Sequence, residues 1–403
     1  MAYTVAVLPR ALTKPLRKAA GQYPVVTVTG PRQSGKTTLV QSAFPRYAYV
    51  SLEDPDLRSL ALEDPRGFLA QFDGPAILDE VQNVPQLLSY IQTLVDKRSR
   101  AGQFILTGSQ NLLLLQSVSQ SLAGRTAILH LLPLSLSEIH RRAPLSLDVI
   151  GRRLPKQDRL LDLDWPEVVW RGFYPSLQSN KVQPQSWLAN YYRTYVERDV
   201  RSIVNVGDLE TFSRFVRICA GRCGQLLNTV SLGNDCGITH TTVRRWLSVL
   251  EASFIIQLLR PYHQSFNKRL IKAPKLYFTD TGLLCYLLGI RSSRDLRSHS
   301  SRGAVFESFV VAELMKAHWH QGIEPSLWFW RDSGGHELDL ILDHHGSNVA
   351  IEIKSGETVA SDYYDGLKYW QAMAVGISPT ALIYGGNRML RSHGTMTLPW
   401  SAL

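Results

Sequence analysis

A glycine-rich loop near the start of the chain carries the residues best suited to chemistry. Residues 30–37 read GPRQSGKT and fit the pattern GxxxxGK(S/T) without a mismatch. A β-branched run over residues 23–29 precedes the loop and a helical stretch over residues 36–43 follows it, as this phosphate-binding motif requires. Backbone N–H groups of such a loop point at phosphate oxygens, and the helix N-terminus adds a partial positive charge. The residues expected to contact ATP are Gly30, Pro31, Arg32, Gln33, Ser34, Gly35, Lys36, Thr37 and Thr38.

Four side chains have predicted roles in ATP hydrolysis. Lys36 reaches the β- and γ-phosphates, and Thr37 ligates Mg²⁺. An apolar run over residues 75–78 ends in Asp79 and Glu80, at the sheet edge where the phosphate loop is expected. Asp79 is expected to hold the Mg²⁺ and Glu80 to polarise the attacking water as general base. A lone Asp-Glu pair also occurs in solvated loops, but its position after a phosphate loop favours the catalytic role.

Three further residues are candidates for the ATP site. The apolar run over residues 103–107 leads into Ser109, and either Thr107 or Ser109 could sense the γ-phosphate and orient water. The alternative role for Ser109 is a helix cap. Arg125 is a candidate arginine finger, in cis or toward a neighbouring subunit, and an ordinary surface arginine is the equal alternative.

A second group of chemically capable residues lies near the C-terminus. Residues 336–342 and 349–354 alternate polar and apolar side chains, so Asp339, Glu352 and Lys354 can share one face of a strand pair. In a metal-dependent phosphodiesterase with this pattern, the two acids hold Mg²⁺ or Mn²⁺ and the lysine stabilises negative charge. The pattern resembles the PD-(D/E)xK, restriction-endonuclease-like fold. A hairpin with solvated charges and an inactive binding module are the alternatives.

Two acids compete for a supporting role at this second site. Glu307 lies on a predicted helix over residues 306–318 and would be the additional catalytic acid. Glu337 lies two residues before Asp339, on the same face of the predicted strand, and is the alternative. The predicted catalytic set is therefore Glu307, Asp339, Glu352 and Lys354.

The middle of the chain is typical of a helix, a turn and a second helix. Residues 237–246 read GITHTTVRRW, with Thr239 as the predicted N-cap of the second helix. Val243 and the leucines four and seven residues later would face inward. A wing over residues 254–261 would make residues 207–262 a winged helix, used for DNA binding or, alternatively, only for packing or protein contact. The side chains predicted to face nucleic acid, with DNA favoured, are His240, Thr241, Arg244 and Arg245.

The elements that must position these residues alternate between strand and helix. From about residue 20 to 140, short apolar strands alternate with helices, which predicts a parallel sheet covered on both faces. A polar, basic, proline-bearing stretch over residues 141–163 indicates a linker. Further strands over residues 275–278 and 380–384, and a helix over residues 362–374, are predicted near the C-terminus.

Length and charge narrow the class of protein. The 403 residues, 44% of them apolar, suffice for two or three domains with cores, and 28 glycines, 20 prolines and 4 cysteines exclude collagen, low-complexity and disulfide-scaffold classes. A formal net charge of +10 favours a polyanionic partner, with solubility alone as the alternative. The sequence shows neither a signal-peptide pattern nor an apolar run of membrane length, so we expect a cytoplasmic location and no membrane contact.

Several motifs resemble one prokaryotic family of AAA-type P-loop ATPases that carries a C-terminal domain of unknown function. GPRQSGKTTL, LDEVQ and LTGSQ look like its phosphate loop, acidic strand and third strand, and GRTAILHLLPLSLSE, YVERDV, LYFTDTGL and FWRDSGGHELDLIL also resemble it. The resemblance covers about residues 20 to 385. It implies an enzyme that binds and hydrolyses ATP with Mg²⁺, and homo-oligomerisation is a candidate property.

The motifs and the resemblance together predict an α/β fold and an ATPase that acts on DNA. The alternative is a regulatory, defence or toxin–antitoxin-related ATPase whose C-terminal domain is an inactive protein- or nucleic-acid-binding module. The predicted domains are an AAA-type P-loop ATPase domain (1–145), a linker and helical segment (146–206), a winged helix (207–274) and a PD-(D/E)xK nuclease-like domain (275–403).

Overall fold

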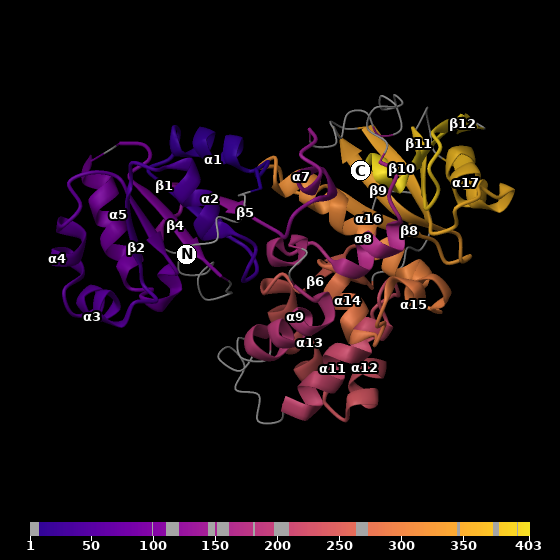
Figure 1. Ribbon diagram of the computed structural model, residues 1–403, viewed down its shortest axis with the longest axis horizontal. Coiled ribbons are helices and arrows are strands. Elements are labelled where there is room, and N and C mark those ends of the chain that lie inside the picture. Colours follow the sequence, from indigo (N-terminus) through magenta and orange to yellow (C-terminus); the bar gives the residue numbers. More distant parts are fainter. Residues whose placement is uncertain are drawn as a thin grey trace. The chain divides into compact units, whose positions relative to one another are not determined.

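The protein, seen as a computed structural model, divides into two compact units (Figure 1). The first unit falls within residues 1–134, 252–254 and 318–324, and the second within residues 135–251, 255–317 and 325–403. The residues that the structure describes are 8–98, 100–109, 121–143, 150, 161–179, 182–196, 209–262, 273–344, 347–373, 379–392 and 394–403.

A parallel five-stranded sheet forms the centre of the first unit, with the spatial order β2-β3-β4-β1-β5. Its strands are β1 (Val25–Thr29), β2 (Ala48–Ser51), β3 (Ala76–Asp79), β4 (Phe104–Gly108) and β5 (Thr126–His130). Its helices are α1 (Thr13–Ala20), α2 (Lys36–Ala43), α3 (Pro55–Glu63), α4 (Pro65–Ala70), the 3₁₀ turn η1 (Val81–Asn83) and α5 (Leu87–Arg98).

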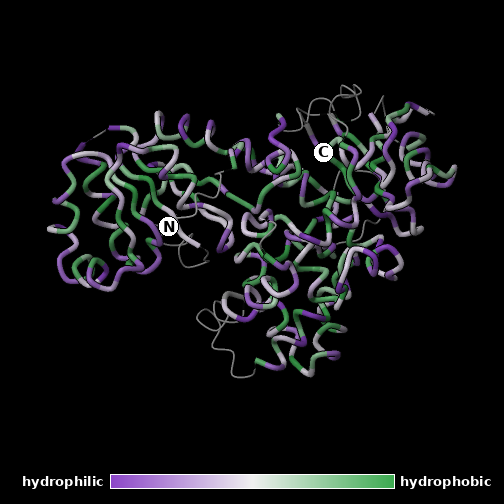
Figure 2. The backbone as a smooth tube through the Cα atoms, in the orientation of Figure 1, coloured by the Kyte–Doolittle hydropathy of each residue, from purple (hydrophilic) through white to green (hydrophobic). Residues whose placement is uncertain are grey.

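Helices cover both faces of this sheet, as the alternation of strands and helices predicted. Val26 and Val28 pack into one hydrophobic cluster with α1 and α2, whereas Val25 packs into a second cluster with α4 and α5. Short strands of Val, Ile, Leu and Thr suit this environment because side chains on both faces are buried. Figure 2 shows the hydrophobic strands inside the unit and hydrophilic residues on the outer turns. The parallel α/β architecture is therefore confirmed, and β5 is a strand that the sequence did not predict.

Helices dominate the first part of the second unit. They are α7 (Leu136–Ile139), α8 (Trp165–Arg171), η4 (Pro175–Gln178), α9 (Pro184–Tyr191), the π-helical η5 (Tyr192–Val196), α11 (Leu209–Gly221), α12 (Thr229–Cys236), α13 (His240–Ala252), α14 (Thr281–Leu287), α15 (Ser293–Ser298) and α16 (Arg302–Trp319). Most of the YVERDV motif and most of the predicted linker lie outside the described residues. No helix in the described part of the chain is long and apolar enough to cross a membrane.

A six-stranded mixed sheet forms the C-terminal part of the second unit, with the order β12-β13-β11-β10-β9-β8. Its elements are β8 (Leu327–Arg331), β9 (Glu337–His344), β10 (Ser347–Lys354), η6 (Ser361–Tyr364), α17 (Asp365–Met373), β11 (Thr380–Tyr384), β12 (Leu390–Ser392), β13 (Thr395–Pro399) and η7 (Trp400–Ala402). β9 is antiparallel to β8 and β10, while β10 and β11 are parallel. Ile351 packs in the cluster that includes α16, and Ala350 packs in the cluster that includes α17. The sheet is therefore covered on both faces.

Strand β9 contains one extra residue next to Asp339. Trp328 of β8 pairs with Ile341 and Trp330 pairs with Leu338, so a step of two residues in β8 matches a step of three in β9. Such a β-bulge bends a strand and re-aims a side chain. The simple alternation of faces that the sequence pattern assumes is thus interrupted at Asp339.

A separate two-stranded sheet follows α13. β6 (Ile256–Leu259) pairs antiparallel with β7 (Lys275–Phe278), and Leu226 also forms an isolated bridge with Lys275. The domain boundary predicted at residue 274 falls inside this sheet, because β7 pairs with β6 and not with a strand of the six-stranded sheet.

Asp280 connects two helical segments from within the core of the second unit. Its carboxylate accepts hydrogen bonds from Phe173 N at 2.7 Å and from Leu283 N at 2.9 Å, and the second of these caps α14. Thr281 Oγ1 donates to Val169 O, in α8, at 2.8 Å. Burial raises the pKa of the Asp280 carboxyl despite these hydrogen bonds. The LYFTDTGL motif therefore joins α8 to α14.

Position 282, at the start of α14, requires a glycine because the backbone of residues 171 and 172 lies against it. Gly172 has φ +83°, in the left-handed region. A Cβ atom added at Gly282 would lie 2.8 Å from Gly172 Cα and 2.9 Å from Arg171 O. Neither contact involves a flexible side chain, so the backbones would have to separate.

We predict that Gly282→Ala lowers the free energy of unfolding by about 1–3 kcal/mol, the usual cost of overpacking. Gly303→Ala is the control, because a Cβ there would meet nothing within 4 Å and alanine is the better helix former. Its free energy of unfolding should stay within about 1 kcal/mol of wild type, on the stabilising side. Urea unfolding measures both values, and equal midpoints for the two variants would contradict the packing argument.

Candidate functional site

The phosphate loop has a backbone that only its glycines allow. Gly30 has φ +154°, and a Cβ atom there would lie 2.1 Å from the carbonyl oxygen of Leu131. Gly35 precedes α2 with φ +92°, and Gln33 also lies in the left-handed region, with φ +63°. Alternation between right- and left-handed residues turns successive N–H groups into a concave anion-binding surface. The loop is therefore shaped for phosphate, between the end of β1 and the start of α2.

Two polar side chains of the loop fit a phosphate group. Lys36 is 5% exposed, and its Nζ donates to the carbonyl oxygens of Gly30 and Pro31, at 3.0 Å each. Ser34 is fully buried, and its Oγ has no hydrogen-bond partner among the described residues. A buried hydroxyl without a partner is costly, and a phosphate oxygen would satisfy it. The remaining predicted contacts, Gln33 and Thr38, are exposed to solvent.

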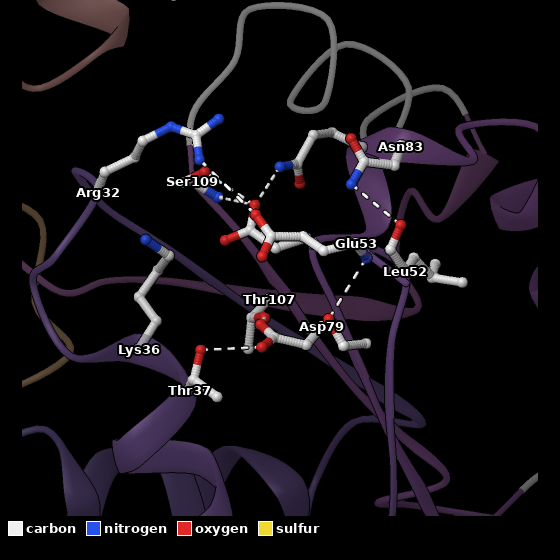
Figure 3. Close-up of polar contacts among 12 residues, drawn as sticks. Arg32, Lys36, Thr37, Leu52, Glu53, Asp79, Asn83, Thr107 and Ser109 are labelled. Carbon is white, nitrogen blue, oxygen red and sulfur yellow. Dashed lines mark hydrogen bonds and ion pairs between the residues drawn. The ribbon is translucent and has the colours of Figure 1, made fainter. Parts of the chain in front are cut away.

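Asp79, at the end of β3, accepts hydrogen bonds from three hydroxyl groups. Thr37 donates to Oδ2 at 2.9 Å, Tyr49 donates to Oδ2 at 2.8 Å, and Thr107 donates to Oδ1. Figure 3 shows Thr37 and Thr107 beside this carboxylate. Thr37 and Asp79, the pair to which the sequence assigned Mg²⁺, thus lie within reach of a single ion. Tyr49 was not identified from the sequence; burial and Asp79 raise the pKa of its phenol to about 12.

Glu80 is held beside the phosphate loop in a constrained conformation. Its backbone has φ +57°, which is uncommon outside glycine and concentrates at functional sites. Its Oε2 accepts hydrogen bonds from Ser109 Oγ at 2.8 Å, from Ser109 N at 3.3 Å and from Gln82 Nε2. Burial opposes ionisation, but the Lys36 ammonium and the Gln82 and Ser109 hydrogen bonds outweigh it, so the pKa of Glu80 is lowered. Gln82 is part of the LDEVQ motif, but no role was predicted for it.

The two arginines predicted to contact ATP lie in different places. Arg32 is part of the loop, and its Nη1 lies 3.8 Å from Glu53 Oε1. Arg125 pairs with Asp96, with 2.9 Å between Nη2 and Oδ2. Val25 N donates to Arg125 O, so Arg125 lies where β1 begins, whereas the phosphate loop lies where β1 ends. A five-residue strand spans about 16 Å, so the structure does not bring Arg125 to the phosphate loop of its own chain.

In the second unit, the predicted acids and lysine lie together. Lys354 Nζ lies 2.5 Å from Glu352 Oε1, and Asp339 Oδ2 accepts a hydrogen bond from Ile353 N at 2.8 Å. Glu307 approaches from α16. Burial and then the Asp339 carboxylate raise the pKa of Glu307 to about 7 and that of Glu352 to about 8. The four predicted residues thus interact electrostatically.

Strand β7 adds two residues that the sequence missed. Lys275 Nζ lies 3.2 Å from Glu307 Oε1 and 4.0 Å from Asp339 Oδ1, and it also pairs with Glu337. Tyr277 OH donates to Glu307 Oε1 at 2.5 Å. The only available signal was the spacing of Lys275 and Tyr277, which places both on one face of a strand. The group, called the carboxylate cluster below, consists of Lys275, Tyr277, Glu307, Glu337, Asp339, Glu352 and Lys354.

This arrangement does not fit the divalent metal that the sequence predicted. Within the described ranges, no group of three or more His, Cys, Asp or Glu side chains is placed to hold a metal ion. The Lys275 ammonium lies among the carboxylates instead, and Glu307, Asp339 and Glu337 outweigh its burial and raise its pKa, so it is charged. Asp339 and Glu352 are therefore not arranged as metal ligands here.

Helix α13 presents the face that the sequence predicted. Thr239 Oγ1 accepts a hydrogen bond from Thr242 N at 3.2 Å, which confirms the N-cap. Val243 is buried, as are the leucines four and seven residues later. The exposed side chains of this helix include His240, Thr241, Arg244 and Arg245.

Three family models match successive parts of the chain. An AAA domain matches residues 22–140, a domain of unknown function, DUF8612, matches residues 162–294, and another, DUF4143, matches residues 302–403. The first unit is therefore an AAA-type P-loop ATPase domain. The boundary between the second and third models lies after β7, in agreement with the pairing of β6 and β7.

Two mycobacterial proteins are similar over most of the chain. The uncharacterized protein Rv2008c of Mycobacterium tuberculosis and the uncharacterized protein Mb2031c of Mycobacterium bovis are each 31% identical over 348 residues, which cover 85% of this chain and 73% of theirs. This chain belongs to their family. Among solved structures, the Walker-type ATPase PABY2304 of Pyrococcus abyssi has a TM-score of 0.44 and 14% identity, covering 70% of this chain and 96% of its own. AMPPCP-bound DnaA from Aquifex aeolicus has a TM-score of 0.28 and 16% identity, covering 60% and 85%.

We predict that Lys36→Ala weakens ATP binding by about 10- to 100-fold, because a charge-assisted hydrogen bond to phosphate is worth about 1.5–3 kcal/mol. Lys97→Ala is the control: it removes the same charge from the exposed end of α5, before β4 begins. Calorimetric titration with a non-hydrolysable ATP analogue measures both affinities. Similar affinities for the two variants would show that Lys36 does not contact phosphate.

Proposed function

We propose that this family member hydrolyses ATP at the phosphate loop, with Glu80 as general base. The observation that carries the proposal is the setting of Glu80, which hydrogen-bonds to Ser109 and lies in the electrostatic field of Lys36. Its lowered pKa keeps the carboxylate ionised at neutral pH, as a base must be to accept a proton. The match of this segment to an AAA domain supports the proposal.

Each polar side chain at this sheet edge has a separate task in the proposed reaction. Lys36 exchanges the loop carbonyls for phosphate oxygens, which form stronger, charge-assisted hydrogen bonds. Thr37 and Asp79 would hold Mg²⁺, which when bound neutralises charge on the phosphates. Glu80 orients the attacking water and accepts its proton at the carboxylate. Ser109 holds that carboxylate in place until the water is positioned.

We predict that Glu80→Gln lowers kcat for ATP hydrolysis by about 10²–10⁴-fold, the usual contribution of a general base. ATP affinity should stay within about threefold of wild type, because glutamine keeps the size of the side chain and much of its hydrogen bonding. Glu63→Gln, at the exposed end of α3, makes the same chemical change and should keep wild-type turnover. Phosphate release and ADP formation measure the rates. Turnover of ATP by Glu80→Gln at the wild-type rate would contradict the assignment of Glu80 as the general base.

We propose that α13 contacts DNA. Helices α11, α12 and α13 are followed by the paired strands β6 and β7, and Leu226 bridges to β7, which is the order of elements in a winged helix. The exposed Arg244 and Arg245 lie on the helix that would read the groove. The net charge of +10 supports a polyanionic partner.

The alternative is a regulatory ATPase whose C-terminal domain binds a partner without cleaving it. One observation favours a non-catalytic C-terminal domain: the Lys275 ammonium lies within ion-pair distance of three of the cluster's carboxylates. We therefore propose no phosphodiester cleavage by the carboxylate cluster in this arrangement. Both versions share ATP hydrolysis in the first unit.

We predict that replacing Arg244 and Arg245 together by alanine reduces the slope of log affinity against log salt concentration by about 2, at about 0.9 per phosphate contact. The matched control is Arg291→Ala with Arg294→Ala, which removes the same charge from exposed positions near α15. Fluorescence anisotropy with a labelled duplex at several salt concentrations gives the slopes. If the slope falls by the same amount in the two double variants, the loss of net charge explains the effect and α13 is not the DNA-binding element.

A further inference from the structure

A buried lysine lies at the centre of the carboxylate cluster. The Lys275 side chain is 4% exposed, and its Nζ pairs with Glu307 of α16 and with Glu337 and Asp339 of β9. The ammonium thus contacts acids from two elements while it is itself carried by a third, β7. The sequence pattern predicted a divalent cation held by Asp339 and Glu352, with Glu307 or Glu337 as the additional acid.

We infer that Lys275 is the resident cation of the carboxylate cluster and stands in the place of a divalent metal, so that the C-terminal domain binds Mg²⁺ or Mn²⁺ only when this ammonium is removed. The inference deepens the proposed non-catalytic role of that domain. The carboxylate cluster is separate from the ATP site, so an experiment can contradict this inference without contradicting the proposed ATP hydrolysis.

Several contacts of the neighbouring residues hold the Lys275 side chain in its position. Tyr277, two residues along the same strand, donates to the same Glu307 oxygen. Ser308, next to Glu307 on α16, accepts from Phe278 N at 3.1 Å and donates to Phe278 O at 3.0 Å. Contacts from Lys275, Tyr277 and Phe278 therefore attach β7 to α16. Lys275 Nζ also lies 5.6 Å from the centre of the Phe329 ring.

Proximity explains why lysine and metal exclude each other. Lys275 Nζ lies within ion-pair distance of three carboxylates, those of Glu307, Glu337 and Asp339. A divalent cation placed among these three carboxylates would lie beside the ammonium, and like charges this close repel. Lys354 forms its ion pair with another acid of the cluster, so removing Lys354 would not clear this place.

A second observation points to a missing cation partner. Glu352 is 8% exposed, and its Oε2 has no hydrogen-bond partner among the described residues. Lys354 satisfies only Oε1. The bulge in β9 next to Asp339 is the kind of irregularity that re-aims a side chain toward a site. The cluster thus keeps an unpartnered carboxylate oxygen of the kind that hard cations bind, while Lys275 neutralises its neighbours.

The test compares Mn²⁺ binding by nucleotide-free full-length variants, all carrying Asp79→Asn to remove the metal ligand of the ATP site. Lys275→Met keeps the length of the side chain and its packing on Phe329 but removes the charge. It should bind one Mn²⁺ per chain, measured by electron paramagnetic resonance of free Mn²⁺, at least about 10-fold more tightly than the Lys275 parent. Lys354→Met is the matched control, because it removes the same charge from the same cluster but leaves Lys275 in place, and it should bind Mn²⁺ no more tightly than the parent.

Three results would overturn the inference. The first is equal Mn²⁺ affinity for the parent and Lys275→Met, and the second is a gain in Lys354→Met as large as that in Lys275→Met. The third is a gained site that survives the addition of Asp339→Asn. If Lys275→Met is unfolded alone, recovery of its thermal transition by millimolar Mn²⁺ supports the inference and absence of recovery overturns it. ATP turnover and the salt slope of DNA binding are measured separately, so failure of the proposed function is distinguishable from failure here.

Discussion

A buried ammonium must have negative or polar partners, and this requirement governs both chemically capable sites. Lys36 and Lys275 are each about as buried as an apolar core residue, and neither could stay ionised there without compensation. Lys36 uses carbonyl oxygens of its own loop, which phosphate oxygens can replace, so its compensation is exchangeable. Lys275 uses carboxylates of other strands and helices, so its compensation is built into the fold. The first arrangement suits a site that binds and releases an anion, and the second suits a permanent internal ion pair.

The backbone elements serve these two lysines in different ways. In the first unit, parallel strands end at one edge, which brings Asp79 and Glu80 of one strand end together with Ser109 of the next, beside the loop that follows β1. The chemistry is thus positioned by strand order alone. In the second unit, the acids come from α16, β9 and β10. Their meeting requires the bulge in β9, the pairing of β9 with β10 and the packing of α16. The second site therefore depends on packing between segments that are far apart in the sequence.

This difference explains how much the sequence could predict. The phosphate loop, Asp79, Glu80 and Ser109 are each adjacent to a strand with a recognisable pattern, so their meeting follows from the rule that parallel strands end together. Tyr49 escaped prediction because its contact with Asp79 depends on which strand neighbours β3. Arg125 was a candidate for the phosphate site of its own chain because strand direction was not considered for β5, and the structure leaves the alternatives of a finger toward a neighbouring subunit and of a surface arginine. Lys275 and Tyr277 could not be predicted, because nothing local in the sequence indicates that β7 packs on α16, and a metal was the simplest partner for the acids that were seen.

The family boundary at residue 302 has a consequence for the autonomy of the C-terminal domain. The segment matched by that model contains all four carboxylates of the cluster but not β7, the strand that carries Lys275. A fragment excised at this boundary would keep its acids and lose their main counter-ion, so it would differ in electrostatics from the same residues within the whole chain. The region that precedes the C-terminal domain therefore supplies, through β7, the cation that lies among the carboxylates of that domain.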